Sequence, residues 1–149
     1  MKVREANLTS RISQLEVKGH DTSVFSAGMT QTLTLPSNTV VVYDRVFVNV
    51  GHDYNSSSGE FVCRWAGYYF FSVHAVAKFG KDVDLVLQLN HKDLVSFNDG
   101  GNFATNSVAL QLTQGDRVRV VTSGSFSSYF FNKQHLSVAT FSGYLIHTL

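Results

Sequence analysis

From residue 21 onward, hydrophobic and polar side chains alternate in short runs, and clusters of turn-forming residues separate these runs. Alternation with a period of two is typical of strands that have one face in a core and the other in solvent. The turn clusters, such as residues 36–38 and 98–101, recur at spacings suited to antiparallel strands. The pattern predicts ten strands, at 23–29, 31–35, 39–48, 60–64, 67–78, 83–90, 93–97, 105–113, 116–122 and 135–147.

No helical pattern interrupts these strands, so the crossover helices that parallel sheets require are missing. Ten short strands close economically as two packed sheets, because this arrangement covers edges that a single open sheet would expose. We therefore predict an all-β fold, a ten-stranded antiparallel jelly-roll β-sandwich preceded by a short N-terminal helix. The candidate core faces are formed by alternating residues: Leu85, Leu87 and Leu89; Val108, Leu110 and Leu112; Val118 and Val120; Phe141 and Leu145.

The tract 67–76 is apolar on both of its faces, which is unusual for a strand with one solvated side. One face can fill the sandwich. The other face, which would carry Tyr68 and Phe70, then needs a second cover, either from another subunit or from a long loop. We favour the subunit, which makes Tyr68 and Phe70 candidate trimerisation residues.

Residues 3–17 have a different period from the rest of the chain. Leu8, Ile12 and Leu15 follow one another at spacings of four and three, and charged residues occupy the other positions. A helix of this length is marginal in isolation, so its apolar edge should pack against copies of itself or against the domain. We therefore expect two units: a helical or coiled-coil segment at 1–20 and a globular domain at 21–149.

Composition excludes several classes of protein. The 149 residues are 44% hydrophobic and 15% charged, which is too apolar for a disordered chain, and one core suffices for this length. The net charge of +1 comes from scattered residues, so no basic stripe suggests nucleic acid as a partner. No apolar run approaches the length of a membrane span. A single cysteine, Cys63, excludes an internal disulfide and is expected to be a buried apolar residue, with pairing to another chain as the alternative.

Motifs of common enzymes are also missing from the sequence. It contains no nucleophile elbow, no His-Glu-x-x-His run and no Walker-type loop. The six histidines are scattered without metal-ligand spacing, and His74 stands out because the strand that carries it should be buried. These observations favour a binding module over an enzyme, and they require no cofactor.

One stretch of the chain resembles the signature of the C1q globular domain. In that signature, aromatic residues, an Asn or Asp, and a Gly-x-Tyr-x-Phe tract follow at fixed spacings. The matching residues here are Asn49, Tyr54, Phe61, Gly67, Tyr69 and Phe71. Tyr43 and Val73 depart from the usual aromatic residues at the two ends but remain apolar. The likeness extends over roughly residues 22 to 149 and includes 115–120 and 141–146.

This resemblance implies a jelly roll of the C1q and tumour-necrosis-factor type, assembled as a homotrimer and used for recognition rather than catalysis. The collagen-like stalk common in the family is absent, and the helix at 8–16 stands in its place, as in C1q-domain proteins of invertebrates, especially molluscs. The resemblance further implies secretion. No apolar leader follows Met1, so we expect a signal peptide that is not part of this sequence; a cytoplasmic chain is the alternative.

The loop 123–134 is richer in aromatic residues than a plain turn requires. Its aromatic rings could stack on sugars or fill protein pockets, while its polar groups orient a ligand. The alternative is that the rings close the end of the sandwich or the trimer axis. The candidate ligand-binding residues are Phe126, Tyr129, Phe130, Phe131, Asn132 and Lys133.

Two further kinds of site are candidates. Asp99 and Asn102 lie in a glycine-rich loop, near a position where some C1q domains carry a calcium-binding Asp, so calcium is a candidate ligand. The neutral amide of Asn102 favours a solvated turn instead. Asn7 and Asn55 both begin N-glycosylation sequons, and Asn55 is the better candidate because it lies in a polar loop.

Two functions follow as hypotheses. The first is a secreted homotrimer that binds surface carbohydrate or other repeated microbial ligands, as a lectin or innate-immune recognition protein. The second is an extracellular protein ligand or organiser that engages a receptor through its trimer surfaces, without lectin activity. Both can use the same scaffold, because specificity lies in loops.

Overall fold

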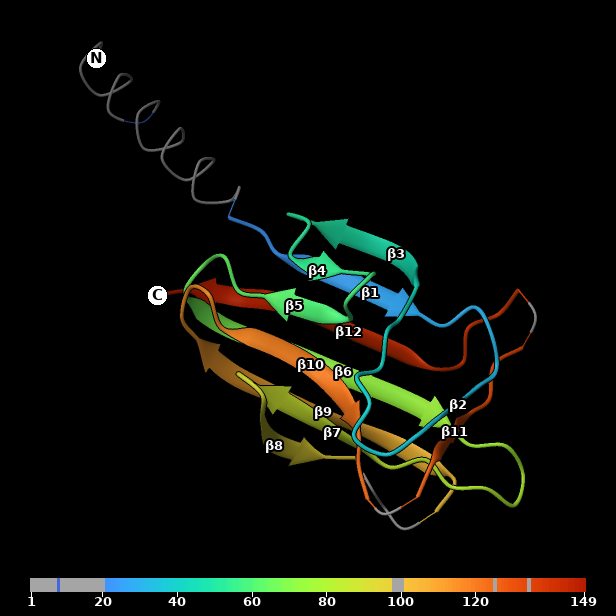
Figure 1. The fold of residues 1–149 in the computed structure, drawn as a ribbon. Helices are drawn as coiled ribbons and strands as arrows, with labels where there is room; N and C mark the ends of the chain where they lie inside the picture. The colour runs from blue at the N-terminus through green and yellow to red at the C-terminus, as the bar shows by residue number, and fades with distance from the viewer. Residues whose placement is uncertain (1–7, 9–20, 98–100, 125, 134) are drawn as a thin grey trace.

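The computed structural model describes residue 8 and residues 21–97, 101–124, 126–133 and 135–149 (Figure 1). The described residues form twelve strands, all paired antiparallel. These are β1 (Val24–Gly28), β2 (Leu33–Leu35), β3 (Arg45–Val50), β4 (Tyr54–Asn55), β5 (Glu60–Val62), β6 (Gly67–Val76), β7 (Leu85–Leu89), β8 (Lys92–Ser96), β9 (Phe103–Leu112), β10 (Arg117–Thr122), β11 (Ser128–Phe130) and β12 (Thr140–Thr148).

The strands form two five-stranded sheets that pack face to face, which confirms the predicted antiparallel jelly-roll sandwich (Figure 1). Apart from Leu8, the predicted N-terminal helix lies outside the described residues. The first sheet has the order β3-β1-β12-β6-β9, and the second has the order β4-β5-β10-β7-β8. Strands β2 and β11 form a separate small ladder. No helix in the described part of the chain is long and apolar enough to cross a membrane.

The observed strands differ from the predicted ones in three places. The predicted strand 39–48 is replaced by a crossing segment, in which Val40 bridges Val121, followed by β3 from Arg45. The last strand begins at Thr140 instead of residue 135, because the preceding residues form a loop. Strands β4 and β11 have only two and three residues, which is too short for an alternating pattern to reveal them.

Aromatic rings from both sheets fill the centre of the sandwich. The Phe25 ring lies 5.0 Å from that of Tyr54, 5.4 Å from that of Phe61 and 4.9 Å from that of Phe141. Gly143 makes this packing feasible, because a Cβ atom at this position would lie 2.6 Å from the Phe71 ring and 2.7 Å from the Phe25 ring. A side chain there would displace both rings.

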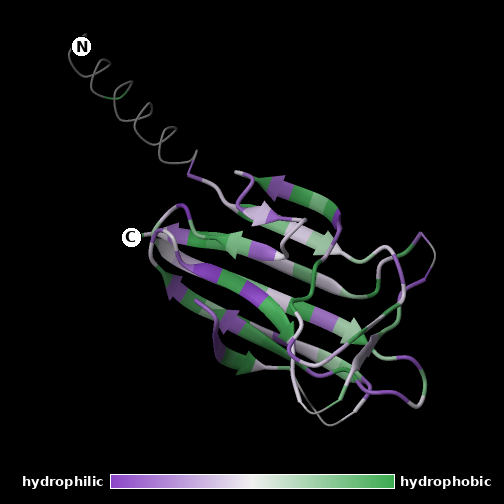
Figure 2. Ribbon diagram, in the orientation of Figure 1, coloured by the Kyte–Doolittle hydropathy of each residue, from purple (hydrophilic) through white to green (hydrophobic). Residues whose placement is uncertain are grey.

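The predicted core faces are confirmed. Leu85, Leu87, Leu112, Val118, Val120 and Phe141 are fully buried, whereas Leu89, Val108, Leu110 and Leu145 pack against the core from its margins. Figure 2 shows the alternation directly along β10, where hydrophilic and hydrophobic positions follow one another. The outward positions of β10 carry Arg117 and Arg119, which pair with Glu60 and Gln88 on the neighbouring strands.

The crossing segment is fastened to the core through two tyrosines. The Tyr54 hydroxyl donates a hydrogen bond to the Tyr43 carbonyl at 2.8 Å and accepts one from the Tyr43 amide at 3.1 Å. Burial raises the pKa of Tyr54 to about 12, so the hydroxyl keeps its proton at neutral pH and remains able to donate. This bond holds residues 40–44 in place as they pass from one sheet to the other.

Phe71→Ala should lower the free energy of unfolding by about 3–5 kcal/mol, because it removes a fully buried ring and leaves a cavity between its aromatic neighbours. Chemical denaturation measures this loss. Phe79→Ala is the matched control: that ring lies in solvent, so the change should stay within about 0.5 kcal/mol. Equal midpoints for Phe71→Ala and the unchanged chain would contradict the core placement of β6.

Candidate functional site: an assembly face and a loop end

The outward face of the sheet β3-β1-β12-β6-β9 carries an apolar row that crosses all five strands. Strand register aligns Val50 with Val24, Val24 with Tyr144, Tyr144 with Phe70, and Phe70 with Ala109. The rings of Phe70 and Tyr144 lie 5.6 Å apart. We call this side of the sheet the assembly face.

The assembly face is not covered by any other described part of the chain. Tyr144 is 46% exposed and Tyr68, next to the row on β6, is 43% exposed, while Phe70 is half-buried between its neighbours. The sequence left two candidates for covering this face, another subunit or a long loop. Among the described residues, no long loop covers it. An exposed apolar row of this extent is typical of a surface that binds another protein.

A row of hydroxyl groups runs beside the apolar row. Register aligns Ser26 with Ser142, Ser142 with Ser72, and Ser72 with Ser107, and the two hydroxyls of Ser26 and Ser142 are 2.7 Å apart. In the next row, His74 lies between Thr140 and Thr105. His74 therefore lies on the outward face and is half-buried within the single chain, where the expected second cover would come from another subunit. Small hydroxyl side chains allow another chain to approach closely and offer it hydrogen-bond partners.

The start of the domain is held by a buried carboxylate. The Asp53 side chain is only 8% exposed, accepts a hydrogen bond from Ser23 at 2.7 Å and lies 3.2 Å from the Arg64 Nε atom. The Asp53 bonds fix where the chain enters β1 beside the assembly face.

The predicted helical seam is described at one position only. Leu8 has helical backbone and is exposed, whereas Ile12 and Leu15 lie outside the described residues.

The other end of the domain consists of loops, and we call it the loop end. It holds the described residues of the segments 77–84, 123–127 and 131–139, which adjoin β6, β10 and β12 at the ends away from the C-terminus (Figure 1). Backbone bonds join these loops: the Tyr129 amide donates to the Asp82 carbonyl at 3.0 Å, and the Phe131 amide donates to the Val76 carbonyl at 2.8 Å.

Two of the candidate ligand-binding residues have structural partners at the loop end. Phe130 is fully buried in the core. The Asn132 side chain, 6% exposed, accepts hydrogen bonds from the backbone amides of Val138 and Ala139 and donates one to the Gln31 carbonyl. These contacts narrow the predicted ligand surface, because neither side chain has a free polar group or face to offer a ligand.

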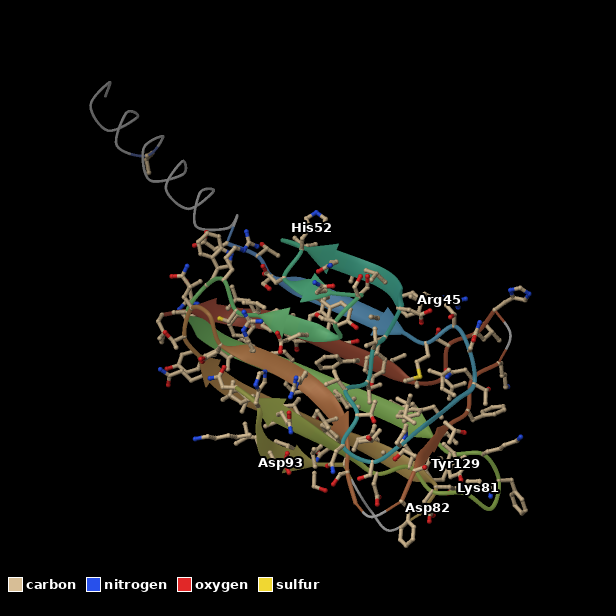
Figure 3. All side chains as sticks on the ribbon, in the orientation of Figure 1. Arg45, His52, Lys81, Asp82, Asp93 and Tyr129 are labelled. Carbon is tan, nitrogen blue, oxygen red and sulfur yellow. The ribbon has the colours of Figure 1, made fainter. Side chains whose placement is uncertain are left out.

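The remaining candidates lie nearer the surface. Phe126 and Lys133 are exposed, and Tyr129 and Phe131 are half-buried. The Lys81 ammonium lies 5.0 Å from the centre of the Tyr129 ring, a cation–π contact that sequence reasoning missed because the two residues are 48 positions apart in the chain. Figure 3 shows Lys81, Asp82 and Tyr129 together at this end, away from Asp93 on β8.

The calcium prediction has limited support here. Asp99 lies outside the described residues, and the Asn102 carbonyl already accepts a hydrogen bond from the Ala77 amide at 2.7 Å. Within the described ranges, no three side chains of His, Cys, Asp or Glu gather as a metal site. Calcium binding at Asp99 and Asn102 remains a prediction.

Asn55 lies exposed at the turn between β4 and β5. Its side-chain oxygen accepts hydrogen bonds from the backbone amides of Ser57 at 2.8 Å and Ser58 at 3.3 Å. These bonds order the sequon while leaving it at the surface, where a glycan could be attached. Asn7 lies outside the described residues.

Cys63 is buried below the loop that joins β5 to β6. Its sulfur lies 3.3 Å from the Trp65 carbonyl oxygen and 3.5 Å from the Tyr69 hydroxyl, to each of which the thiol can donate. Burial raises the pKa of the thiol, so less thiolate forms at neutral pH than in a free cysteine. The position agrees with a packing role and argues against pairing with another chain.

Two antiparallel sheets with an exposed apolar face and a separate loop end define a jelly-roll sandwich of the kind that binds through its faces and loops. A family model described as the C1q domain matches residues 24–146. The chain therefore belongs to the C1q domain family. Proteins of this family are typically extracellular and trimeric and act in recognition or ligand binding.

Two curated relatives illustrate the range of the family. The chain is 30% identical over 129 residues to a heavy metal-binding protein, HIP, from Mytilus edulis, and the match covers 83% of the chain. It is 28% identical over 131 residues to the human complement C1q and tumor necrosis factor-related protein 9B. The chain spans 60% of the first relative's length and 38% of the second's.

Solved structures agree on the fold. The globular domain of zebrafish complement 1qA protein superimposes with a TM-score of 0.70 at 23% identity and covers 85% of this chain and 99% of that one. The Eiger TNF structure from S. frugiperda superimposes with a TM-score of 0.63 at 10% identity and covers 86% and 93% of the two chains. At these identities the likeness shows the jelly-roll fold alone.

Native Cys63 should react with a thiol reagent on the order of a hundredfold more slowly at neutral pH than the same residue in denaturant, because burial blocks access and raises its pKa. The native rate should rise as the pH increases and the thiolate forms. Absorbance of the released chromophore measures both rates. Ser57→Cys combined with Cys63→Ser is the control, since residue 57 is exposed and should react rapidly. Fast labelling of native Cys63 would contradict its buried state.

Proposed function

We propose that this chain is an extracellular homotrimeric recognition protein, which binds surface carbohydrate or other repeated microbial ligands through its loop end. The observation that carries this proposal is the apolar row on the assembly face, from Val50 to Ala109. That row needs a cover, and membership of a family that is typically trimeric supports two further copies of the chain as that cover.

Assembly through this face leaves the loop end free. The loops lie at the end of the strands, whereas the assembly face runs along their sides, so three loop ends can point in one direction. Weak single contacts then gain strength from multivalency, provided that the target presents repeated ligands. Surface glycans are such a target, and the exposed Phe126 ring and the Lys81–Tyr129 pair are suited to stacking on sugar rings and bonding to their hydroxyls.

The second candidate is a receptor protein bound across the trimer surfaces. Exposed loops on a rigid sandwich suit either ligand, so the scaffold alone favours neither. The absence of glycan binding at high trimer concentration would favour the receptor. In either role the chain acts by binding rather than by catalysis.

Deleting residues 1–18 should leave a trimer of the β-domain, because the roughly two heptads of residues 3–17 supply too little energy to hold three chains together. The truncated chain keeps the whole assembly face. Sedimentation equilibrium at micromolar concentration measures the outcome. A clean monomer would assign assembly to Leu8, Ile12 and Leu15 instead.

A pair of matched variants locates the interface within the domain. Tyr144→Glu places a charge in the middle of the apolar row and should convert the truncated trimer to monomers. Leu94→Glu is the control, because Leu94 has similar exposure, 49%, but lies on β8 of the other sheet. Thermal unfolding of both variants shows whether each chain is still folded, so that loss of the trimer can be told apart from loss of the fold. Equal effects of the two changes would argue against the assembly face.

The trimer should bind selected glycans on an array, and Tyr129→Ala combined with Phe126→Ala should abolish that binding without affecting the trimer. Leu94→Ala serves as the control away from the loop end. The array is read with calcium and with a chelator. Loss of binding in chelator would support a calcium site at Asp99 and Asn102. Glycan binding that survives the double change would remove the loop end from the proposal.

A further inference from the structure

Three large apolar side chains stand out from the loop end, each on a different loop. Phe79 on the loop 77–84 is 98% exposed, Phe126 on the loop 123–127 is 75% exposed, and Leu136 on the loop 131–139 is 63% exposed. We call these three residues the apolar tips. All three loops adjoin the same end of the sandwich, opposite the C-terminus (Figure 1).

Backbone hydrogen bonds shape the loops that carry two of the apolar tips, Leu136 and Phe79. Lys133 and Leu136 exchange two backbone hydrogen bonds of 3.1 and 3.0 Å, which close a tight turn. Next to Phe79, Gly80 has a φ of 76°, a backbone conformation that glycine adopts without strain, and the Lys81 amide donates to the Lys78 carbonyl at 2.9 Å. The exposure of these side chains is therefore a property of the fold.

Positive charges lie beside two of the apolar tips. Phe79 is flanked in sequence by the exposed Lys78 and Lys81. Leu136 follows the exposed Lys133 within its turn, and Arg45 donates to the backbone carbonyl of residue 135 at 3.3 Å.

The described acidic side chains of this end are Asp44, Asp82 and Asp84. Asp84 is half-buried, and Asp44 is exposed but accepts two hydrogen bonds from Thr30, whereas Asp82 is exposed beside Lys81. The exposed lysines next to the apolar tips, Lys78, Lys81 and Lys133, therefore outnumber the one exposed carboxylate that lies beside them in the sequence, Asp82.

We propose that the loop end docks on the surface of an anionic lipid bilayer. The apolar tips enter the boundary between headgroups and acyl chains, and the flanking lysines contact the anionic headgroups. A bilayer fits this arrangement better than a protein pocket does, because separate tips can enter one planar apolar phase, whereas a pocket requires a contiguous apolar surface. The inference does not depend on the proposed glycan binding, and one chain carries all three tips.

The test uses the full chain and vesicles of phosphatidylcholine, alone or mixed with phosphatidylglycerol. The unchanged chain should sediment with the mixed vesicles, and added salt should weaken this binding. Phe79→Ser combined with Leu136→Ser should lower the partition coefficient by about tenfold or more, because apolar area no longer enters the membrane. Lys78→Ser combined with Lys81→Ser should weaken binding to the mixed vesicles and leave binding to phosphatidylcholine unchanged.

Two controls make the result specific. Leu94→Ser removes an apolar side chain from β8, away from the loop end, and should bind vesicles like the unchanged chain. Phe79→Trp should show a blue-shifted emission on mixed vesicles, while the unchanged chain, whose single tryptophan is Trp65 between β5 and β6, should not.

Several outcomes would overturn the inference. They are no vesicle binding by the unchanged chain, equal binding after the Phe79 and Leu136 changes, or no shift for Phe79→Trp. Neither Phe79 nor Leu136 belongs to the proposed glycan surface. If the Phe79 and Leu136 changes abolish vesicle binding while glycan binding persists, the two activities are separate. A negative result for one proposal then leaves the other proposal unaffected.

Discussion

Phe25 lies at the centre of the sandwich, and its ring meets rings from both sheets. Tyr54 and Phe61 approach it from the second sheet, Phe141 and Phe71 from its own sheet. Stacked and edge-to-face contacts of this kind favour one relative placement of the sheets, because the rings must interdigitate at close-packed density. Gly143 leaves the space in which the Phe25 and Phe71 rings meet. The spacing of the two layers follows from this cluster.

The core packing also determines which residues lie on the outward face of the first sheet. Once Tyr69, Phe71 and Val73 of β6 point into the core, the pleat of the strand forces Tyr68, Phe70 and Ser72 to the other side. The same register brings Val24, Tyr144 and Ala109 level with Phe70. The core therefore determines which residues form the assembly face. The second sheet differs, because its outward positions carry Arg117 and Arg119 bonded to neighbouring strands.

Polar side chains position the loop end, which the aromatic cluster does not reach. The Asn132 side-chain amide bonds to the backbone of Gln31 and to that of the adjacent residues Val138 and Ala139, and Ser128 bonds to the backbone of Asp84. The bonds to Gln31 and Asp84 join residues 101 and 44 positions apart in the chain, so the loops take this arrangement only in the folded domain. The outermost residues of the loops take no part in them and remain available for binding.

The sequence by itself determined the fold class, the family and most of the core, because period-two alternation and the Gly67, Tyr69 and Phe71 spacing are local signals. Short strands such as β4 and β11 were missed, since two or three residues carry no period. Only the tertiary structure separated Phe130 and Asn132, which are internal, from Phe126, which is exposed. It also brought Lys81 onto Tyr129 and grouped Phe79 with Leu136 at one end. Composition marks an aromatic loop, but which of its rings face solvent depends on contacts with distant strands, and those contacts exist only in the folded chain.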